Sequence, residues 1–235
     1  MATKDFAHLH VHTEYSMLDG AARLGDLFNY AKELGMSSMA TSDHGFLFGA
    51  FDFWRQAKAH DIKPIIGVEA YLTPGTHRTD RSRVRWGDGS RDDVSGGGAY
   101  THMTMWAETT EGMHNLFRAS SIASLEGQLY KPRMDREVLQ TYSKGLIATT
   151  GCPSGEIQTR LRLGQFDEAL QAASDFRDIF GKDNFYCEVM DHGLDIERNV
   201  QEDLHRLAKQ LNLPYVATND LHYTRQEDHT AHAAL

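Results

Sequence analysis

The feature that most constrains the fold of this chain is the alternation of short apolar, β-rich runs with stretches of helical spacing. Apolar stripes in 24–34, 166–176 and 200–211 predict three amphipathic helices. Seven runs have the composition of strands, namely 6–12, 38–42, 64–72, 99–107, 146–150, 185–190 and 215–218. Such alternation favours an α/β fold with a mostly parallel sheet. Seven units predict a closed β/α barrel with one unit fewer than usual, and a doubly wound open sheet is the alternative.

Composition limits the class of protein. Of the 235 residues, 40% are hydrophobic and 24% charged, which is ordinary for a soluble globular chain. No apolar run is long enough to span a bilayer, and the start of the chain lacks the layout of a secretion signal. Cys152 and Cys187 are the only cysteines and form no CxxC pair. We therefore expect a cytoplasmic protein without a disulfide framework and without a membrane partner, in which Cys187 is a small core residue.

The net charge of −9 argues against a free-standing DNA-binding protein, which would usually present a basic face. It is compatible with a site whose positive charge comes from bound metal. The last residues, HYTRQEDHTAHAAL, stop inside a helix-like pattern. We therefore interpret 1–235 as a single domain excised from a longer protein.

One segment, 73–98, interrupts the alternation. It is rich in Gly, Arg and Asp and lacks apolar periodicity. A loop of this length is usually functional or disordered. Its arginines could meet a polyanion, but its aspartates weaken that interpretation, so we expect a flexible, solvated insertion.

Histidines are unusually frequent, with 13 in the chain, and three alternate in FAHLHVHTEYSMLDG. Residues i, i+2 and i+4 of a strand face the same side, so His8, His10 and His12 should point together. Asp19 follows seven residues after His12. His8 would lie about 6.6 Å deeper than His10, so we assign it to the core or to support of the neighbouring ligands.

Metal-capable side chains recur at the ends of the predicted strands. Barrel enzymes have their active sites at this rim, and closure of the last strand against the first would set Asp220 and His222 beside His10 and His12. Glu69 lies in an otherwise apolar run, where a carboxylate is costly unless paired or metal-bound. Strand six also offers Glu188 and His192, and His192 could touch substrate. The nine best candidate ligands are His10, His12, Asp19, His44, Glu69, His102, Cys152, Asp220 and His222.

Any one of these residues alone is more often structural than a ligand. Their joint placement, with HxH in the first run and DxH after the last, is improbable by chance. One tetrahedral zinc uses four donors, so nine donors predict two or three metal ions that share bridging ligands. The thiolate of Cys152 favours zinc, while carboxylates can admit manganese or magnesium at other positions.

The motifs HLHVHTEYSMLDG, TSDHG, GVEAY, YTHMTMWA, TTGCPSG and ATNDLHY resemble the PHP (polymerase and histidinol phosphatase) superfamily. More narrowly, they resemble the N-terminal PHP domains of bacterial replicative DNA polymerase III α subunits, in their actinobacterial form. The resemblance implies a distorted (β/α)7 TIM-like barrel, the PHP fold, with three divalent metal ions. The nine ligand positions that it implies match the nine residues above, with none missing. A complete set implies an active 3′–5′ exonuclease that proofreads for the polymerase.

The expected reaction is hydrolysis of the terminal phosphodiester of a mispaired primer, with Glu69, Asp220 and His222 as the catalytic residues. The partners expected are the primer 3′ end, the rest of the polymerase chain and other replisome components, and we expect the isolated domain to be monomeric. Two other functions stay open. One is a catalytically silent scaffold stabilised by metal that docks polymerase or exonuclease partners. The other is a phosphomonoesterase resembling histidinol phosphatase.

Overall fold

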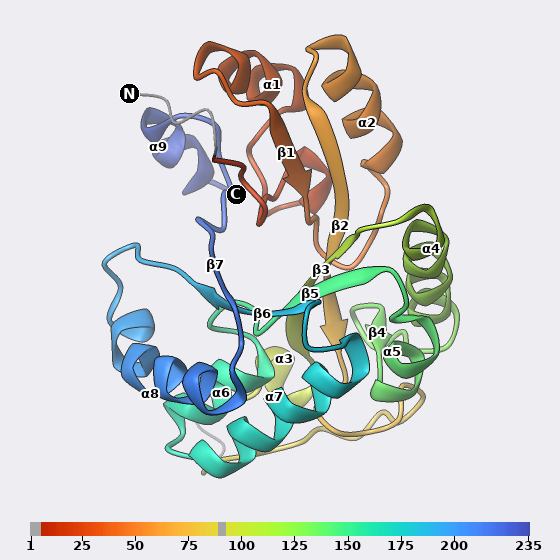
Figure 1. The fold of residues 1–235 in the computed structure, drawn as a ribbon, viewed down its shortest axis with the longest axis vertical. Coiled ribbons are helices and arrows are strands. Elements are labelled where there is room, and N and C mark those ends of the chain that lie inside the picture. The colour runs from red at the N-terminus through yellow and green to blue at the C-terminus, as the bar shows by residue number, and fades with distance from the viewer. Residues whose placement is uncertain (1–5, 89–92) are drawn as a thin grey trace.

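The computed structural model of the chain describes residues 6–88 and 93–235. Within these residues a mixed sheet curls into a half-barrel, with helices between its strands (Figure 1). The strand order is β1-β2-β3-β5-β6-β7, and β4 pairs with β2 beside this path. The strands are β1 Ser38–Thr41, β2 Lys63–Leu72, β3 Thr101–Ala107, β4 Arg133–Met134, β5 Leu146–Thr149, β6 Phe185–Val189 and β7 Tyr215–Ala217. The α/β fold predicted from the sequence is confirmed.

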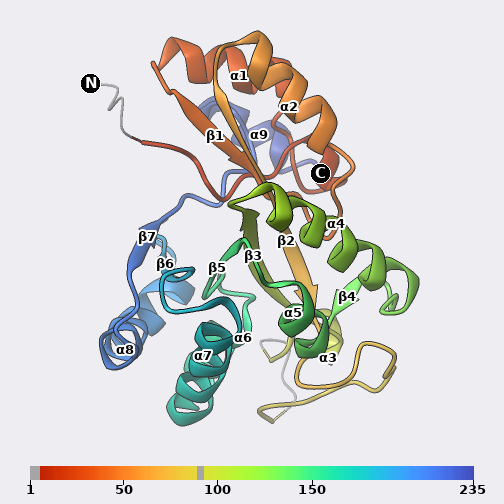
Figure 2. The same ribbon diagram turned by 45° about the vertical axis from the view of Figure 1, so that its right-hand side comes forward.

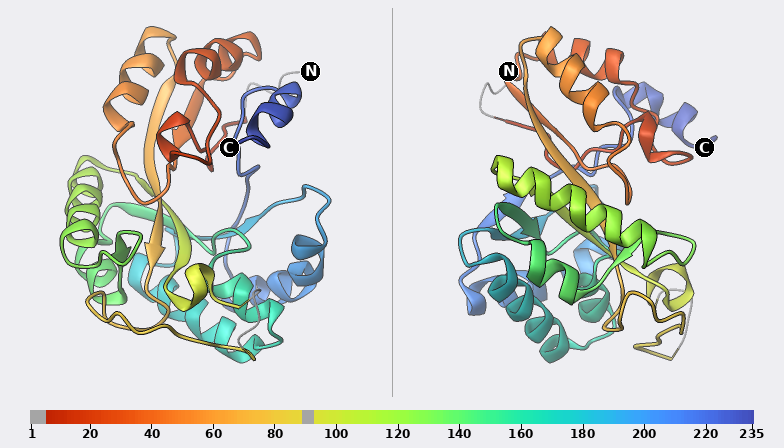
Figure 3. Two further views of the ribbon diagram at one scale, coloured as in Figure 1. Left: turned by 180° about the vertical axis from the view of Figure 1, so that it is seen from behind. Right: turned by 90° about the vertical axis from the view of Figure 1, so that its right-hand side faces the viewer.

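Helices cover the outside of the curled sheet. Helices α1 and α2 lie beside β1 and the first half of β2, while α6, α7 and α8 lie together near β5, β6 and β7 (Figures 1 and 3). The α-helices are α1 Leu24–Glu33, α2 Ala50–Ala59, α3 Ser95–Gly98, α4 Thr110–Leu125, α5 Arg136–Tyr142, α6 Glu156–Arg162, α7 Phe166–Phe180, α8 Asp195–Leu211 and α9 His229–His232. Glu14–Ser16 and Gln226–Asp228 form 3-10 turns. No described helix is both long and apolar enough to cross a bilayer.

The predicted helical stripes are the buried faces of α1, α7 and α8. In α1 the buried side chains are Leu24, Leu27, Phe28 and Ala31. They belong to a smaller core between α1, α2 and β1, whereas α7 and α8 contribute to a larger core around β2, β3, β5 and β6. Cys187 is fully buried in the larger core, as expected.

The first predicted strand, 6–12, does not form a regular strand. Single backbone pairings tie it to β1 on one side and to the segment after β7 on the other. Val11 and Leu221 form an isolated parallel bridge, so the predicted closure of the last segment against the first is present in this reduced form. The hydrogen bonds run from Ala40 N to His8 O, from Ser42 N to Val11 O, from His12 N to Leu221 O and from Leu221 N to His10 O.

Strand β3 runs opposite to its neighbours. It is antiparallel to both β2 and β5, whereas the other strand pairings are parallel. His102 therefore lies at the start of its strand and not at the end, where the expected parallel order would have placed it. The reversal brings the start of β3 to the rim where β2 ends, since His102 pairs with Tyr71.

The described residues of 73–98, which end in α3, cross one end of the molecule (Figure 2). Arg78 forms ion pairs with Glu126, Asp135 and Glu137. The guanidinium of Arg160 stacks on Trp86, 3.7 Å from the ring centroid. These contacts tie the segment at Arg78 to the end of α4 and the start of α5, and at Trp86 to α6. The predicted flexibility of this insertion stays a prediction.

Candidate metal centre

All nine predicted ligands converge on one buried cluster, and Glu69 lies at its centre. The Oε1 atom of Glu69 is 3.1 Å from both His102 Nδ1 and Cys152 Sγ. Its Oε2 atom is 2.7 Å from His44 Nδ1. Nε2 of His10 and Nε2 of His12 each lie 3.5 Å from a Glu69 oxygen. Both carboxylate oxygens thus face atoms of other candidate ligands, an arrangement that would allow Glu69 to bridge two metal ions.

Two further carboxylates complete the cluster. Asp220 Oδ1 lies 3.3 Å from His10 Nε2 and 3.2 Å from His12 Nε2. Asp19 Oδ2 lies 2.6 Å from His44 Nε2 and 3.2 Å from His222 Nε2. Three overlapping groups could each hold a metal ion: His10, His12 and Asp220; His44, Glu69 and His102; and His12, Asp19, His44 and His222.

Two of the histidines have their tautomers fixed by a hydrogen bond on the side of the ring away from the other cluster atoms. His10 Nδ1 donates to Glu188 Oε1 over 2.8 Å, and His222 Nδ1 donates to the carbonyl of Asp220 over 2.7 Å. Each of these contacts consumes the ring N–H on the far side and leaves the Nε2 lone pair facing the cluster. Partners of this kind orient metal-binding imidazoles and raise their basicity.

His12 is oriented through a short relay. Its Nδ1 lies 3.0 Å from Ser16 Oγ, and Ser16 donates its own proton to Asp43 Oδ1 over 2.7 Å. The hydroxyl therefore accepts from His12, whose Nε2 is again free. Asp43 also accepts from the backbone and side chain of Thr13, so it fixes the turn that follows the HxH motif.

Sequence reasoning named Glu188 only as a candidate donor and overlooked Ser16 and Asp43. Glu188 is fully buried in β6 and accepts from Thr218 over 2.6 Å as well as from His10. The argument already applied to Glu69, that a carboxylate inside an apolar strand needs a partner, would have identified its role. Asp43 was inside the TSDHG motif, but nothing in the spacing showed that it would support another element.

The donor set fits metal ions. Four buried side-chain atoms of the cluster have no hydrogen-bond partner. His10 Nε2, His12 Nε2 and Asp220 Oδ1 face one another, and His44 Nδ1 faces Glu69 Oε2. A buried polar atom without a partner is costly, and the great majority of such atoms in proteins are satisfied. Cations held among these imidazole nitrogens and carboxylate oxygens would satisfy the four atoms.

The electrostatics of the cluster agree with this interpretation. Burial alone would lower the pKa of His44, but the neighbouring carboxylates of Asp19 and Glu69 raise it to about 9. Hydrogen bonds from His222 and His44 hold the pKa of Asp19 far below its usual value. Burial lowers the pKa of His12 to about 4. The carboxylates are thus ionised and draw positive charge into the cluster.

Exposure differs from one side of the cluster to the other. His10, His12 and Glu69 are at most 2% exposed, while Asp19 is 43% and Asp220 25% exposed. His222, at 19%, lies on the same accessible side. The cluster is therefore closed to solvent at His10, His12 and Glu69. It is open to solvent on the side of Asp19, Asp220 and His222, which we call the mouth of the cluster.

Three other groups of metal-capable side chains lie outside the cluster. His192 uses both ring nitrogens, one with Glu197 Oε1 and one with the carbonyl of Asn219, next to Asp220. His8 is half-buried against Phe6 and touches none of the nine predicted ligands through a described interaction. The group His77, Asp135 and Glu137 has its carboxylates paired with Arg78.

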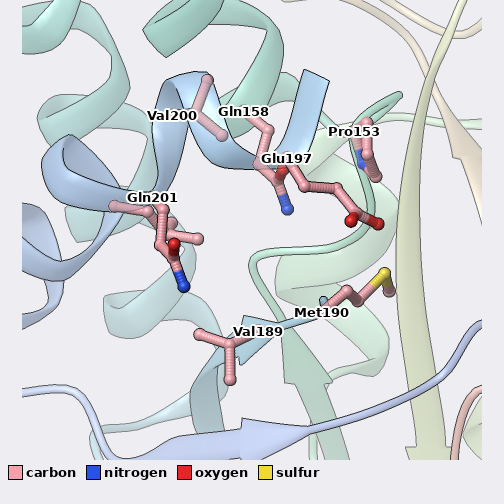
Figure 4. Close-up of a pocket in the computed structure, with 8 residues that line it drawn as sticks. Pro153, Gln158, Val189, Met190, Glu197, Val200 and Gln201 are labelled. Atoms are coloured by element: carbon pink, nitrogen blue, oxygen red, sulfur yellow. The ribbon is translucent and has the colours of Figure 1, made fainter. Parts of the chain in front are cut away.

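A small pocket lies between the end of β6, α6 and the start of α8 (Figure 4). None of the nine predicted ligands lines it. Its one carboxylate, Glu197, accepts from both the backbone and the ring of His192. The lining residues are Pro153, Gln158, Val189, Met190, Glu197, Val200, Gln201 and Leu204.

Comparison with known proteins defines the class of this fold and site. The model of the PHP domain family matches residues 8–192, and the chain belongs to this family. The chain is 58% identical over its full length to DNA polymerase III subunit alpha of Saccharopolyspora erythraea and 53% identical to that of Mycobacterium leprae. It is 44% identical over 99% of its length to that of Deinococcus radiodurans. The resemblance read from the motifs is confirmed.

The chain spans about one fifth of the length of these relatives, 20% of the first two and 17% of the third. Solved structures are similar in fold. An amidohydrolase from Chromobacterium violaceum matches 94% of this chain and 89% of its own, with a TM-score of 0.54 at 13% identity. A two-domain protein from Bacteroides vulgatus, containing a predicted PHP-like metal-dependent phosphoesterase, matches 94% of this chain and 53% of its own, with a TM-score of 0.53 at 14% identity.

Proposed function

We propose that this chain is a metal-dependent 3′–5′ DNA exonuclease domain of a replicative DNA polymerase, and that it hydrolyses the terminal phosphodiester of a mispaired primer. The observation that carries the proposal is the convergence of all nine candidate donors, eight of them around Glu69, with four buried atoms that lack a hydrogen-bond partner. The similarity to part of DNA polymerase III subunit alpha chains supplies the substrate class.

In this proposal the chain's own residues have separate roles. Glu69 holds the centre together because both of its oxygens face ligand atoms. Asp220 and His222 stand at the mouth, where a substrate phosphate can reach them. Divalent ions held by these residues, zinc foremost and three in number, would supply a water of lowered pKa and clamp the attacking and leaving oxygens.

The open mouth favours catalysis over a purely structural role. Structural zinc sites are closed by protein ligands, whereas catalytic sites keep a position open to water or substrate. Here the exposed fraction rises from 0% at His12 to 43% at Asp19 within one cluster. A scaffold that only needs metal for stability has no use for such access.

A direct comparison of substrates tests the proposal. The metal-loaded chain should shorten a primer with a mismatched 3′ end faster than a fully paired primer, because the frayed end can leave the duplex. It should act poorly on p-nitrophenyl phosphate. The reverse preference would support a phosphomonoesterase, and inactivity toward both substrates in a metal-loaded, folded sample would support the scaffold.

The proposal also concerns partners. The rest of a polymerase chain and other replisome components would deliver the primer end to the mouth of the cluster, in the cytoplasm. We expect the isolated domain to be monomeric, which sedimentation of the purified chain would test.

A further inference from the structure

Two cationic side chains lie over two tyrosine rings on one side of the metal centre. Lys131 Nζ is 5.3 Å from the centroid of the Tyr71 ring, and Arg83 Cζ is 5.4 Å from the centroid of the Tyr130 ring. Tyr130 and Lys131 are consecutive, so the two pairs are adjacent. Among residues 6–88 and 93–235, no carboxylate forms an ion pair with Lys131 or Arg83.

This surface is continuous with the candidate metal centre. Tyr71 follows Glu69 by two residues in β2, so both side chains face the same side of the sheet. The Tyr71 ring lies 5.8 Å from the His44 ring and 5.2 Å from the His102 ring. A single tyrosine ring therefore separates Lys131 from two of the proposed ligands.

Tyr130 is held in a conformation that exposes its ring. Its φ of 61° is left-handed, a region that bulky residues rarely adopt, and its side chain is 75% exposed. The turn is closed by a hydrogen bond from Leu129 N to Lys131 O. Arg83 is fixed beside it by hydrogen bonds to the carbonyls of Gly96 and Gly97. Backbone strain that presents a large ring to solvent is typical of functional positions.

We propose, on the basis of the function proposed above, that these residues bind the single strand whose 3′ end enters the metal centre. Lys131 and Arg83 each contact a backbone phosphate, and Tyr130 stacks on an unpaired base. Proteins that bind single strands without sequence preference combine cationic groups along the backbone with aromatic rings on which bases stack. A chain with a net charge of −9 needs such local cations to hold a polyanion near its site.

Binding of a labelled oligothymidylate of about twelve nucleotides tests the proposal. Fluorescence anisotropy is measured at several salt concentrations, in an Asp220→Asn background that limits hydrolysis. Lys131→Ala and Arg83→Ala should each weaken binding and reduce the slope of log K against log salt by about 0.7. Tyr130→Ala should weaken binding about tenfold without changing the slope, and Tyr130→Phe should restore it.

Lys182→Ala is the matched control, because Lys182 is an exposed cation in the turn between α7 and β6. The slope of log K against log salt for Lys182→Ala should equal that of the parent. Melting curves confirm that each variant is folded. Unchanged slopes in Lys131→Ala and Arg83→Ala would overturn the proposal.

A small substrate separates this inference from the proposed function. Bis(p-nitrophenyl) phosphate carries a single phosphate, which leaves none for Lys131 when it occupies the metal centre. Lys131→Ala should therefore hydrolyse this substrate at the parent rate, while the KM of the variant for an oligonucleotide rises. If the parent hydrolyses no phosphodiester, the exonuclease proposal fails, and altered salt slopes would still support the binding surface. If Lys131→Ala and Arg83→Ala digest oligonucleotides with the parent KM, the binding surface is wrong and the exonuclease proposal stands.

Discussion

His10 Nδ1 donates to Glu188 Oε1 over 2.8 Å, and both side chains are completely buried. Glu188 is itself held by the hydroxyls of Thr149 and Thr218. The contact directs His10 Nε2 toward Asp220 and away from solvent. A residue on β6 therefore sets the orientation of a candidate ligand in the first segment of the chain.

The first prediction concerns Glu188→Gln. Glutamine keeps the volume but removes the charge. It also brings an N–H₂ group toward the hydroxyls of Thr149 and Thr218, which in the parent donate to the carboxylate of Glu188. The amide oxygen is a weaker acceptor for His10 Nδ1–H than the carboxylate, so the tautomer of His10 is held less firmly and zinc affinity should fall by about 10- to 100-fold. Competition with a chelating dye measures this affinity.

Glu202→Gln on the exposed side of α8 is the control, and its zinc affinity should match the parent. Equal affinities in Glu188→Gln and the parent would show that the His10–Glu188 contact is not needed to hold metal.

The second prediction concerns removal of metal. Elemental analysis of protein purified without chelator should find two to three divalent ions per chain, zinc among them. Ions that bind only the folded state stabilise it, by about 2.7 kcal/mol at a hundredfold excess over Kd. Chelation should therefore lower Tm by roughly 5–10 °C, and zinc should restore it. An unaltered melting curve after confirmed metal removal would count against a buried metal cluster.

Much of the fold could be predicted because burial leaves periodic marks in the sequence. The stripe that includes Leu24, Leu27 and Phe28 became the buried face of α1, and the apolar run at 64–72 became most of β2. The direction of β3 leaves no such mark, since an apolar run reads the same in either direction. The two-residue strand β4 was missed because two residues carry no period.

The candidate ligands were easier to predict than the residues that orient them. His10, His12 and Asp220 could be grouped because strand alternation and closure fix which side chains meet. Ser16 and Asp43 support His12 through a turn whose geometry is set by tertiary contacts. Tyr130 and Lys131 gave no signal, because a left-handed turn without glycine is not recognisable from residue types.

The third prediction concerns Arg133, whose side chain is 1% exposed. Its guanidinium donates to the carbonyls of Gly127, Ala99, Arg78 and Asp80. Arg133→Met would leave these carbonyls without their donor, so we expect a loss of about 3 kcal/mol in the free energy of unfolding. Urea denaturation measures this change.

The same substitution removes the hydrogen bonds to the carbonyls of Arg78 and Asp80, so limited proteolysis within 73–98 should become faster. Arg118→Met on the exposed side of α4 should change the free energy of unfolding by no more than about 0.5 kcal/mol. If Arg133→Met is as stable as Arg118→Met, the buried guanidinium does not anchor the segment.

The last prediction concerns Asp220→Asn, with Asp61→Asn as its control. Both aspartates have left-handed backbone, with φ of 43° and 58°, and asparagine tolerates this conformation well. Both variants should therefore fold, with circular dichroism like that of the parent. Only Asp220 faces two imidazole nitrogens of the cluster, at 3.3 and 3.2 Å.

Loss of its charge should weaken or displace the metal that His10 and His12 help to hold. A displacement of about 1 Å can cost on the order of a hundredfold in rate, so Asp220→Asn should lose most 3′–5′ hydrolysis of a mismatched primer. Asp61→Asn should digest that primer at the parent rate, because the exposed Asp61 lies at the end of α2. If Asp220→Asn also digests it at the parent rate, catalysis does not depend on this cluster, and a scaffold role becomes the better explanation of the nine converging donors.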